Sequence, residues 1–164
     1  MSVRVRRFVD ADAEAVSRIM FDSFMLFLAE HMQGESPKPP EYWRNAVNRL
    51  DGDSEIAGFV AEDGGKAVGF LLARAMKKNG LGALEVIGVA PECVSAGVGT
   101  ALFREAEAFW KGLRMRKVYT CVSAHNTRAL MFYLKRGFRP EGVQREHFHP
   151  GVDEINLAIF YRDP

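Results

Sequence analysis

The sequence predicts a mixed α/β domain in which helices pack on a central sheet. Strand-like and helix-like segments alternate along the chain in the order β-α-α-β-β-β-α-β-α-β-β, and turn residues separate most of them. Neither a repeat nor a linker interrupts the 164 residues. That length is sufficient for a hydrophobic core, so we expect a single domain over residues 1–164.

The composition is that of an ordinary globular protein, with 48% apolar and 26% charged residues. A net charge of +1 favours neither nucleic acid nor an anionic membrane as an obligatory partner. No apolar run approaches the roughly 20 residues of a membrane helix, and the basic N-terminus does not lead into a signal-peptide core. Cys93 and Cys121 show neither metal nor disulfide spacing. We therefore expect two free thiols, no metal and a cytoplasmic location.

The chain begins with alternating apolar and charged side chains over residues 3–8, which is typical of a half-buried strand. Asp10 or Asp12 is placed to cap a helix whose apolar positions continue to Leu28. The Pro-rich segment 33–40 predicts a loop after this helix.

Pro40 suits the first turn of a second, short helix. A hairpin of strands 56–61 and 67–75 follows, with its turn at Asp63-Gly64-Gly65. The apolar residues expected on the short helix are Trp43, Val47 and Leu50. The remaining expected elements are strands over 83–89, 117–123, 138–148 and 155–161 and helices over 97–113 and 126–136, with turns at 79–80 and 149–151.

A strand that ends in Val89-Ala90-Pro91 leads through a five-residue loop to Gly97-Val98-Gly99-Thr100-Ala101 at the start of a helix. A helix N-terminus presents backbone N–H groups without internal partners, and its dipole favours an anion. Gly97 and Gly99 carry no Cβ that would keep a phosphate away from the backbone. The segment therefore suggests a phosphate cradle, with a simple strand-to-helix turn as the alternative.

Two motifs resemble signatures of the GNAT N-acetyltransferase superfamily. The first is Val89-Ala90-Pro91 followed by Gly97-Val98-Gly99. The second runs from Asn126 to Phe138 and fits Asn-x-x-Ala-x-x-Phe-Tyr-x-x-x-Gly-Phe at every marked position. The resemblance implies a mostly antiparallel central sheet with one splayed parallel pair and helices on both faces. It also implies direct transfer of acetyl from acetyl-CoA to a primary amine of a small molecule or peptide, without a metal.

The same resemblance implies how acetyl-CoA is held. Backbone groups near Ile87 and Val89 would hydrogen-bond the pantetheine arm as an added strand does, and the glycine-rich helix start would hold the pyrophosphate. Asn126 caps the next helix by its own chemistry, and the resemblance implies a contact with the cofactor as well. The implied cofactor-binding residues are Ile87, Val89, Val94, Gly97, Val98, Gly99, Thr100, Ala101 and Asn126.

One position departs from the family pattern. Val94 stands where the family usually has Arg or Gln, so a side-chain donor to the pyrophosphate is missing. A charge-assisted hydrogen bond is worth roughly 1.5–3 kcal/mol, and its loss predicts weaker CoA binding. Arg104 or Arg128 is positioned in sequence to compensate. An acyl-CoA-binding regulatory module with little or no turnover is therefore the alternative function.

Two residues are the candidates for catalysis. A lysine-like amine has a pKa of about 10.4 and must lose a proton before it attacks. Glu85 is the candidate base, and strand parity places it on one face with Ile87 and Val89 unless a bulge intervenes. The resemblance implies that Tyr133 protonates the departing sulfur. A solvated or paired Glu85 and a packing role for Tyr133 are the alternatives.

The acceptor is expected, by the same resemblance, between the first two helices and the last two strands. The candidate residues are Phe27, His31, Tyr42 and His147, although core packing or a helix-terminal histidine would also explain them. His147 and His149 have the spacing of a metal pair, but no third ligand is evident nearby in the sequence. Homodimers are common in the family, so a homodimer is the assembly that the resemblance suggests.

Overall fold

Within residues 2–161, which the computed structural model describes, the chain forms seven strands and four α-helices. The strands are β1 (Val3–Arg7), β2 (Ser54–Asp63), β3 (Lys66–Met76), β4 (Leu81–Val89), β5 (Lys117–Ser123), β6 (Arg139–His149) and β7 (Val152–Phe160). The helices are α1 (Ala13–Leu28), α2 (Pro40–Asn48), α3 (Val98–Gly112) and α4 (Thr127–Leu134).

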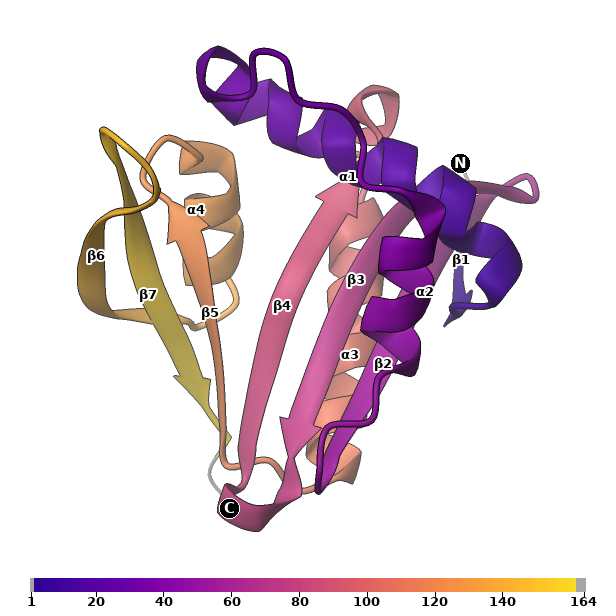
Figure 1. Cartoon of the computed structure of the whole chain (residues 1–164). Coiled ribbons are helices and arrows are strands. Elements are labelled where there is room, and N and C mark those ends of the chain that lie inside the picture. Colours follow the sequence, from indigo (N-terminus) through magenta and orange to yellow (C-terminus); the bar gives the residue numbers. More distant parts are fainter. Residues whose placement is uncertain (1, 162–164) are drawn as a thin grey trace.

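The strands join in one sheet of order β1-β2-β3-β4-β5-β7-β6 (Figure 1). Neighbouring strands run antiparallel except for β4 and β5, which are parallel. Helices α1 and α2 contact one face, and α3 and α4 contact the other. The predicted fold class, a mostly antiparallel sheet with one parallel pair between two helical layers, is confirmed.

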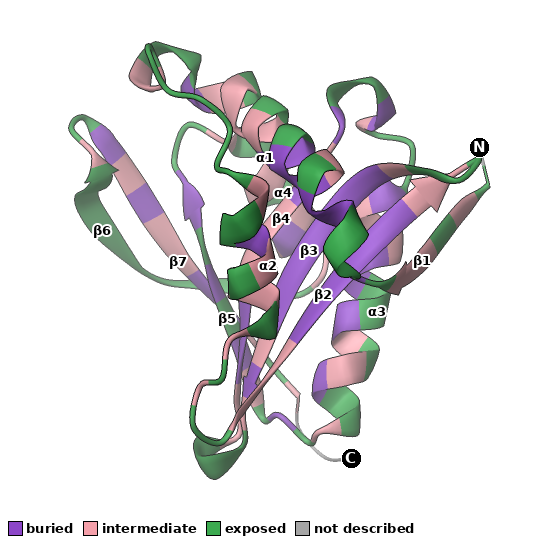
Figure 2. Ribbon diagram, turned by 45° about the vertical axis from the view of Figure 1, so that its right-hand side comes forward, coloured by how far each residue is buried: buried purple, intermediate pink, exposed green. Residues whose placement is uncertain are grey.

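A hydrophobic cluster lies on each face of the sheet. The larger packs α3 and α4 against the strands around Trp110, and the smaller packs α1 and α2 around Trp43. Figure 2 shows buried positions along β2 and β3, whereas β6 is exposed over almost its whole length. Leu50 was expected on α2, but that helix ends at Asn48 and Leu50 is fully exposed. None of the helices in the described part of the chain is long and apolar enough to cross a membrane.

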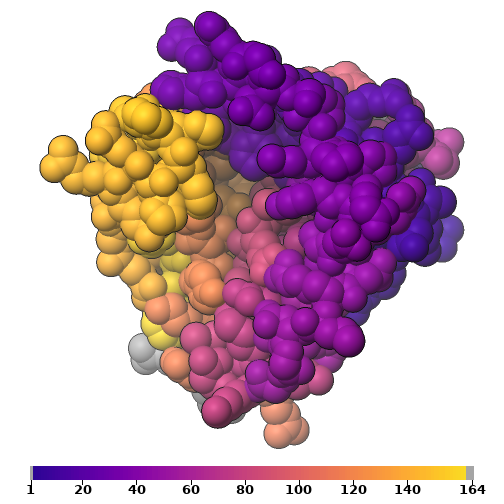
Figure 3. All heavy atoms as spheres, in the orientation of Figure 1, coloured from indigo at the N-terminus to yellow at the C-terminus, as the bar shows by residue number. Residues whose placement is uncertain are grey.

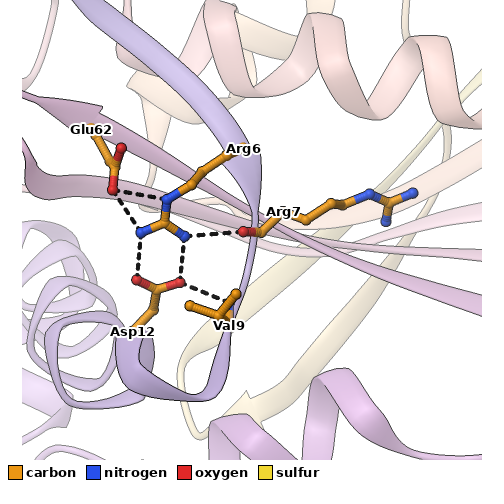
Figure 4. Close-up of polar contacts among 5 residues, drawn as sticks. All are labelled: Arg6, Arg7, Val9, Asp12 and Glu62. Carbon is orange, nitrogen blue, oxygen red and sulfur yellow. Dashed lines mark hydrogen bonds and ion pairs between the residues drawn. The ribbon is translucent and has the colours of Figure 1, made fainter.

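The start of α1 is held in a different way from the predicted cap. Asp12 accepts two hydrogen bonds from the Arg6 guanidinium, at 2.7 and 2.8 Å, and one from the Val9 N–H at 2.8 Å (Figure 4). Glu62 in β2 accepts from the same guanidinium at 2.6 and 2.8 Å. Asp10 instead accepts from the Asn48 amide. The capping prediction is wrong because the Asp12 carboxylate is used to tie β1 to the turn before the helix.

Two irregularities in β4 position the site. Leu72 pairs with Val86 and the next β3 residue, Ala73, pairs with Leu84, so Glu85 is an extra residue in a β-bulge. On its other edge β4 pairs with β5 through three residues only, Leu81 to Ala83. Beyond them, the Thr120 hydroxyl donates to the Leu84 carbonyl at 2.9 Å. The two strands then diverge, as the predicted splayed pair requires (Figure 1).

Candidate active site

A cavity of about 560 Å³ lies where β4 and β5 have separated. Three segments bound it together with α1: the end of β4, the loop and first turn of α3, and the segment that leads from β5 into α4. Its lining residues are Ser23, Leu26, Phe27, Ile87, Gly88, Val89, Cys93, Val94, Ser95, Gly97, Val98, Gly99, Thr100, His125, Asn126, Thr127, Arg128, Ala129 and Phe132. Eight of the nine predicted cofactor residues are in this list, Ala101 being the exception.

The N-terminus of α3 forms one end of this cavity. Gly97 precedes the helix with φ +85°, a left-handed conformation that glycine adopts without strain. The first bond of the helix is donated by Ala101 to the Gly97 carbonyl at 3.0 Å. In the described part of the chain, the N–H groups from Gly97 to Thr100 have no backbone partner. These four donors remain available to an anion.

Gly99 keeps the cavity open beside these donors. A Cβ at this position would lie 3.3 Å from the Phe132 ring and 3.8 Å from Val89. The contact with Phe132 is tighter than ordinary van der Waals distance. An alanine at this position would have to displace the Phe132 ring by a few tenths of an ångström.

A cation stands next to the cradle although Val94 supplies none. The Arg136 guanidinium donates to the Thr100 hydroxyl at 2.5 Å and to the Phe132 carbonyl at 2.7 Å. It also lies over the Phe132 ring, 3.4 Å from the centroid. Arg128 lines the cavity itself. Arg136 was not among the predicted site residues. Its place directly before Gly137 in the second motif is the sequence feature that could have indicated it.

Asn126 caps α4, as predicted, and lies at the cavity. Its side-chain oxygen accepts from the Ala129 N–H at 3.0 Å and so caps α4. The residue also lines the cavity. Since the oxygen is used by the cap, the amide nitrogen is the group left to donate to a ligand.

Tyr133 lies behind the cavity lining, on the α4 side of the sheet. It is 3% exposed and packs between Phe132 and Phe138 at centroid distances of 5.4 and 5.3 Å. Burial raises the pKa of Tyr133 above the ordinary tyrosine value, and the Thr120 hydroxyl offsets part of that effect. The phenol therefore holds its proton where β4 and β5 begin to separate.

Glu85 faces away from Ile87 and Val89. Its Oε1 atom lies 2.5 Å from an Arg49 nitrogen and 3.1 Å from Arg74 Nε, on the side of the sheet that α2 covers. Ile87 and Val89 pack against the cluster on the other face. The bulge causes this reversal of the simple strand parity. Glu85 is consequently a paired carboxylate, bound by two guanidinium groups.

Two of the four predicted acceptor residues lie together. Phe27 lines the main cavity, and with His31 and His125 it also lines a second cavity of about 240 Å³. The ring of His31 lies 5.7 Å from that of His125 and 5.9 Å from that of His149.

The other two predicted acceptor residues lie apart from this group. Tyr42 is exposed and contacts Trp43, and His147 is exposed and contacts Phe148. No set of three His, Cys, Asp or Glu side chains within residues 2–161 is arranged to hold a metal ion.

The model of the acetyltransferase (GNAT) family matches residues 18–138. The chain belongs to the GNAT acetyltransferase family. The match includes both motifs and the whole of α3, β5 and α4, and it confirms the predicted enzyme class, an acyltransferase.

Similar proteins agree with this assignment. An uncharacterized N-acetyltransferase of Methanocaldococcus jannaschii is 25% identical over 156 residues, which are 92% of this chain and 87% of that protein. The structure of Ard1 from Thermoplasma volcanium superposes with a TM-score of 0.82 at 18% identity, over 99% of this chain and all of that one. The PaiA N-acetyltransferase of Thermoplasma acidophilum, solved in complex with coenzyme A, has a TM-score of 0.74 at 20% identity and covers 98% of this chain and all of that one. The two structures share the fold of this chain.

Proposed function

We propose that the protein is an acetyl-CoA-dependent N-acetyltransferase that acts on a primary amine of a small molecule or peptide. One observation carries the proposal. Four unpaired N–H groups at the start of α3 open into a cavity that continues along the edge of β4, where β5 no longer covers it. The cavity thus combines an anion site with free strand-edge hydrogen bonds, which are the two features that the pyrophosphate and the amide-containing arm of CoA require.

The residues divide into those that bind and those that move protons. Backbone groups of Gly97 to Thr100 bind the pyrophosphate, and the β4 edge at Ile87 and Val89 binds the pantetheine arm. Acetyl-CoA, when bound, supplies the acetyl group as a thioester. Tyr133 donates its proton to the sulfur that leaves, because burial keeps the phenol protonated beside the point where the strands separate.

The acceptor approaches from the α1–α2 face of the sheet, opposite the face on which Tyr133 packs. Figure 3 shows a hollow between the β6–β7 hairpin and the α1–α2 segment, with β4 and β5 at its base. The names of the M. jannaschii relative and of PaiA, both N-acetyltransferases, support an amine as the acceptor. The bound coenzyme A of PaiA supports the cofactor.

The test is calorimetric titration with acetyl-CoA of the wild type and of Tyr133→Phe, followed by assays of thiol release with a panel of primary amines. We expect both proteins to bind acetyl-CoA with similar affinity. Thiol release by the variant should be at least about 100-fold slower, since a positioned general acid contributes 10²–10⁴-fold. Binding without thiol release on any amine would instead support the regulatory-module alternative. Absence of binding would refute the proposed function.

A further inference from the structure

Glu154 is a buried carboxylate that the proposed function leaves unexplained. It lies in β7, where it pairs with Ser123 of β5 on one side and Gln144 of β6 on the other. The alternate residues Ile155 and Ile159 pack against the cluster on the α3–α4 side of the sheet. Glu154 therefore points to the opposite face of the sheet, the face that α1 and α2 contact.

The Glu154 side chain is largely buried and has no hydrogen-bond or ion-pair partner in the described part of the chain. The residue is 5% exposed, and its carboxylate makes no hydrogen bond or ion pair with the part of the chain that the structure describes. Asp12, a comparably buried acid, receives three hydrogen bonds. Burying a charge without a partner is costly, so a site of this kind favours a cationic ligand. A primary ammonium group is the cation that the acceptor of this reaction carries.

Strand register brings Glu154 next to the main cavity, because it pairs with Ser123 of β5, and His125 and Asn126, which follow Ser123, line that cavity. Burial raises the pKa of the Cys121 thiol on β5, and the charge of Glu154 raises that pKa further. Tyr133 packs on the α4 side of the sheet and Glu154 points to the opposite side, so the phenol and the carboxylate lie on opposite faces. Such a division suits a reaction that takes a proton from the amine and delivers one to sulfur.

The other groups near Glu154 leave it free for this role. Cys121 is the titratable side chain beside it on β5, and the residue opposite it on β6 is the neutral Gln144. Glu146 and Asp153 are used in hydrogen bonds within the hairpin. The histidines His31, His125 and His149 cluster toward the hairpin end of β7. Burial raises the pKa of Glu154 above the ordinary glutamate value, in the direction of a better proton acceptor at neutral pH.

We infer that Glu154 binds the acceptor ammonium and is the general base of the reaction. Glu85, which is bound by Arg49 and Arg74, then has a structural role in the wall of the acceptor site. The inference rests on the proposed function, because it completes the same reaction. The ammonium N–H bond breaks and an O–H bond forms on Glu154. The amine lone pair then forms the C–N bond to the acetyl carbon, the C–S bond breaks, and Tyr133 protonates the sulfur. The nitrogen, positively charged after the attack, releases its second proton to solvent and becomes the neutral amide. Solvent returns the proton of Glu154 to the Tyr133 phenolate.

The experiment is the pH dependence of kcat/KM for thiol release from acetyl-CoA, with benzylamine, spermidine and short peptides with free N-termini as acceptors. We expect Glu154→Gln to lower kcat at least about 100-fold and to remove the acidic limb of the profile. The matched control, Glu85→Gln, should keep that limb, and both variants should bind acetyl-CoA as the wild type does. An acidic limb that survives in Glu154→Gln, or that disappears in Glu85→Gln alone, would overturn the assignment.

A second measurement does not depend on turnover. In protein labelled with ¹³C at the glutamate carboxyl carbons, Glu154→Gln identifies the resonance of Glu154 as the one that is lost. That resonance should titrate at a higher pH than ordinary glutamate and should move when benzylamine is added. Titration at the ordinary value with no response to the amine would overturn the inference, even if acetyl-CoA binds. A wild type that releases no thiol with any amine would refute the proposed function itself, and the base assignment with it.

Discussion

Single side chains determine whether the cradle at the start of α3 can accept a ligand. Replacing Gly99 with Ala should weaken acetyl-CoA binding about tenfold, which corresponds to about 1.4 kcal/mol. The added Cβ would lie 3.3 Å from the Phe132 ring and would fill part of the space beside the free N–H groups. Calorimetric titration measures the change. Gly112→Ala, in the same helix and with open space around the new Cβ, is the control and should leave the affinity unchanged. Equal affinities for both variants would place the pyrophosphate elsewhere.

Asp12 gives a prediction about stability and pH. Burial opposes its ionisation, but hydrogen bonds from Arg6 and the Val9 N–H outweigh burial, so the pKa of Asp12 is lowered. A lowered pKa contributes stability above the ordinary aspartate value of about 3.9 and loses it as the pH falls through the folded-state pKa. Asp12→Asn should therefore lose about 1–3 kcal/mol at pH 7 and much less at pH 3.

Urea denaturation at the two pH values measures this difference. Glu14→Gln is the control, because Glu14 forms an exposed pair with Arg18 and such pairs contribute little. We expect that control to lie within about 0.5 kcal/mol of the wild type at both pH values. A loss for Asp12→Asn that is equally large at pH 3 would mean that packing, and not charge, explains the burial of Asp12.

Among the secondary-structure elements, α4 begins at a residue with two separable roles. Asn126→Asp keeps the oxygen that caps the helix, so the unfolding free energy should change by less than about 0.5 kcal/mol. The same change removes the amide donor and adds a negative charge to the cavity wall, so acetyl-CoA affinity should fall at least about tenfold. Asn126→Ala should instead lose about 1 kcal/mol of stability. If Asn126→Asp binds acetyl-CoA with wild-type affinity, Asn126 is a helix cap alone.

The elements that could be predicted from the sequence are those whose signals are local. The turn at Gly64 and Gly65, the Pro40 helix start and the Asn126 cap each depend on residues a few positions apart, and the structure has all three. Both family motifs are local in the same sense. The sequence did not determine whether β4 contains a bulge, and strand parity gives the side of Glu85 only if the strand is regular.

Contacts between distant segments could not be predicted in this way. Glu85 meets Arg49, which is 36 positions away in sequence, and Arg136 meets Thr100 at the same separation. The Arg6 guanidinium that engages Asp12 is also bound by Glu62, 56 positions away in β2. The unpaired state of Glu154 depends on the packing of β5, β6 and β7, the last three strands in the sequence. Each of these features depends on how separate elements pack together, which local sequence patterns do not determine.

For the protein as a whole, the continuous sheet predicts cooperative unfolding. The chain has two tryptophans, and they lie in different clusters: Trp43 on the α1–α2 face and Trp110 on the α3–α4 face. In Trp43→Phe and in Trp110→Phe, the fluorescence of the remaining tryptophan and the far-UV circular dichroism should therefore change at the same urea concentration. A fluorescence midpoint that departs from the circular dichroism midpoint in either variant would show that one face unfolds independently.

The short junction between β4 and β5 has a mechanical consequence. Within the sheet itself, three residue pairs and the Thr120 hydroxyl connect a four-stranded half to a three-stranded half. The sheet should bend most easily at this short junction. Thermal motion should therefore change mainly the angle between the two halves. A ligand that contacts the free edges of both β4 and β5 should restrict this bending. Acetyl-CoA would then reduce motion most at the β4–β5 junction, far from its own phosphates. Slower hydrogen exchange of the Leu84 and Thr120 amides on binding would show this effect.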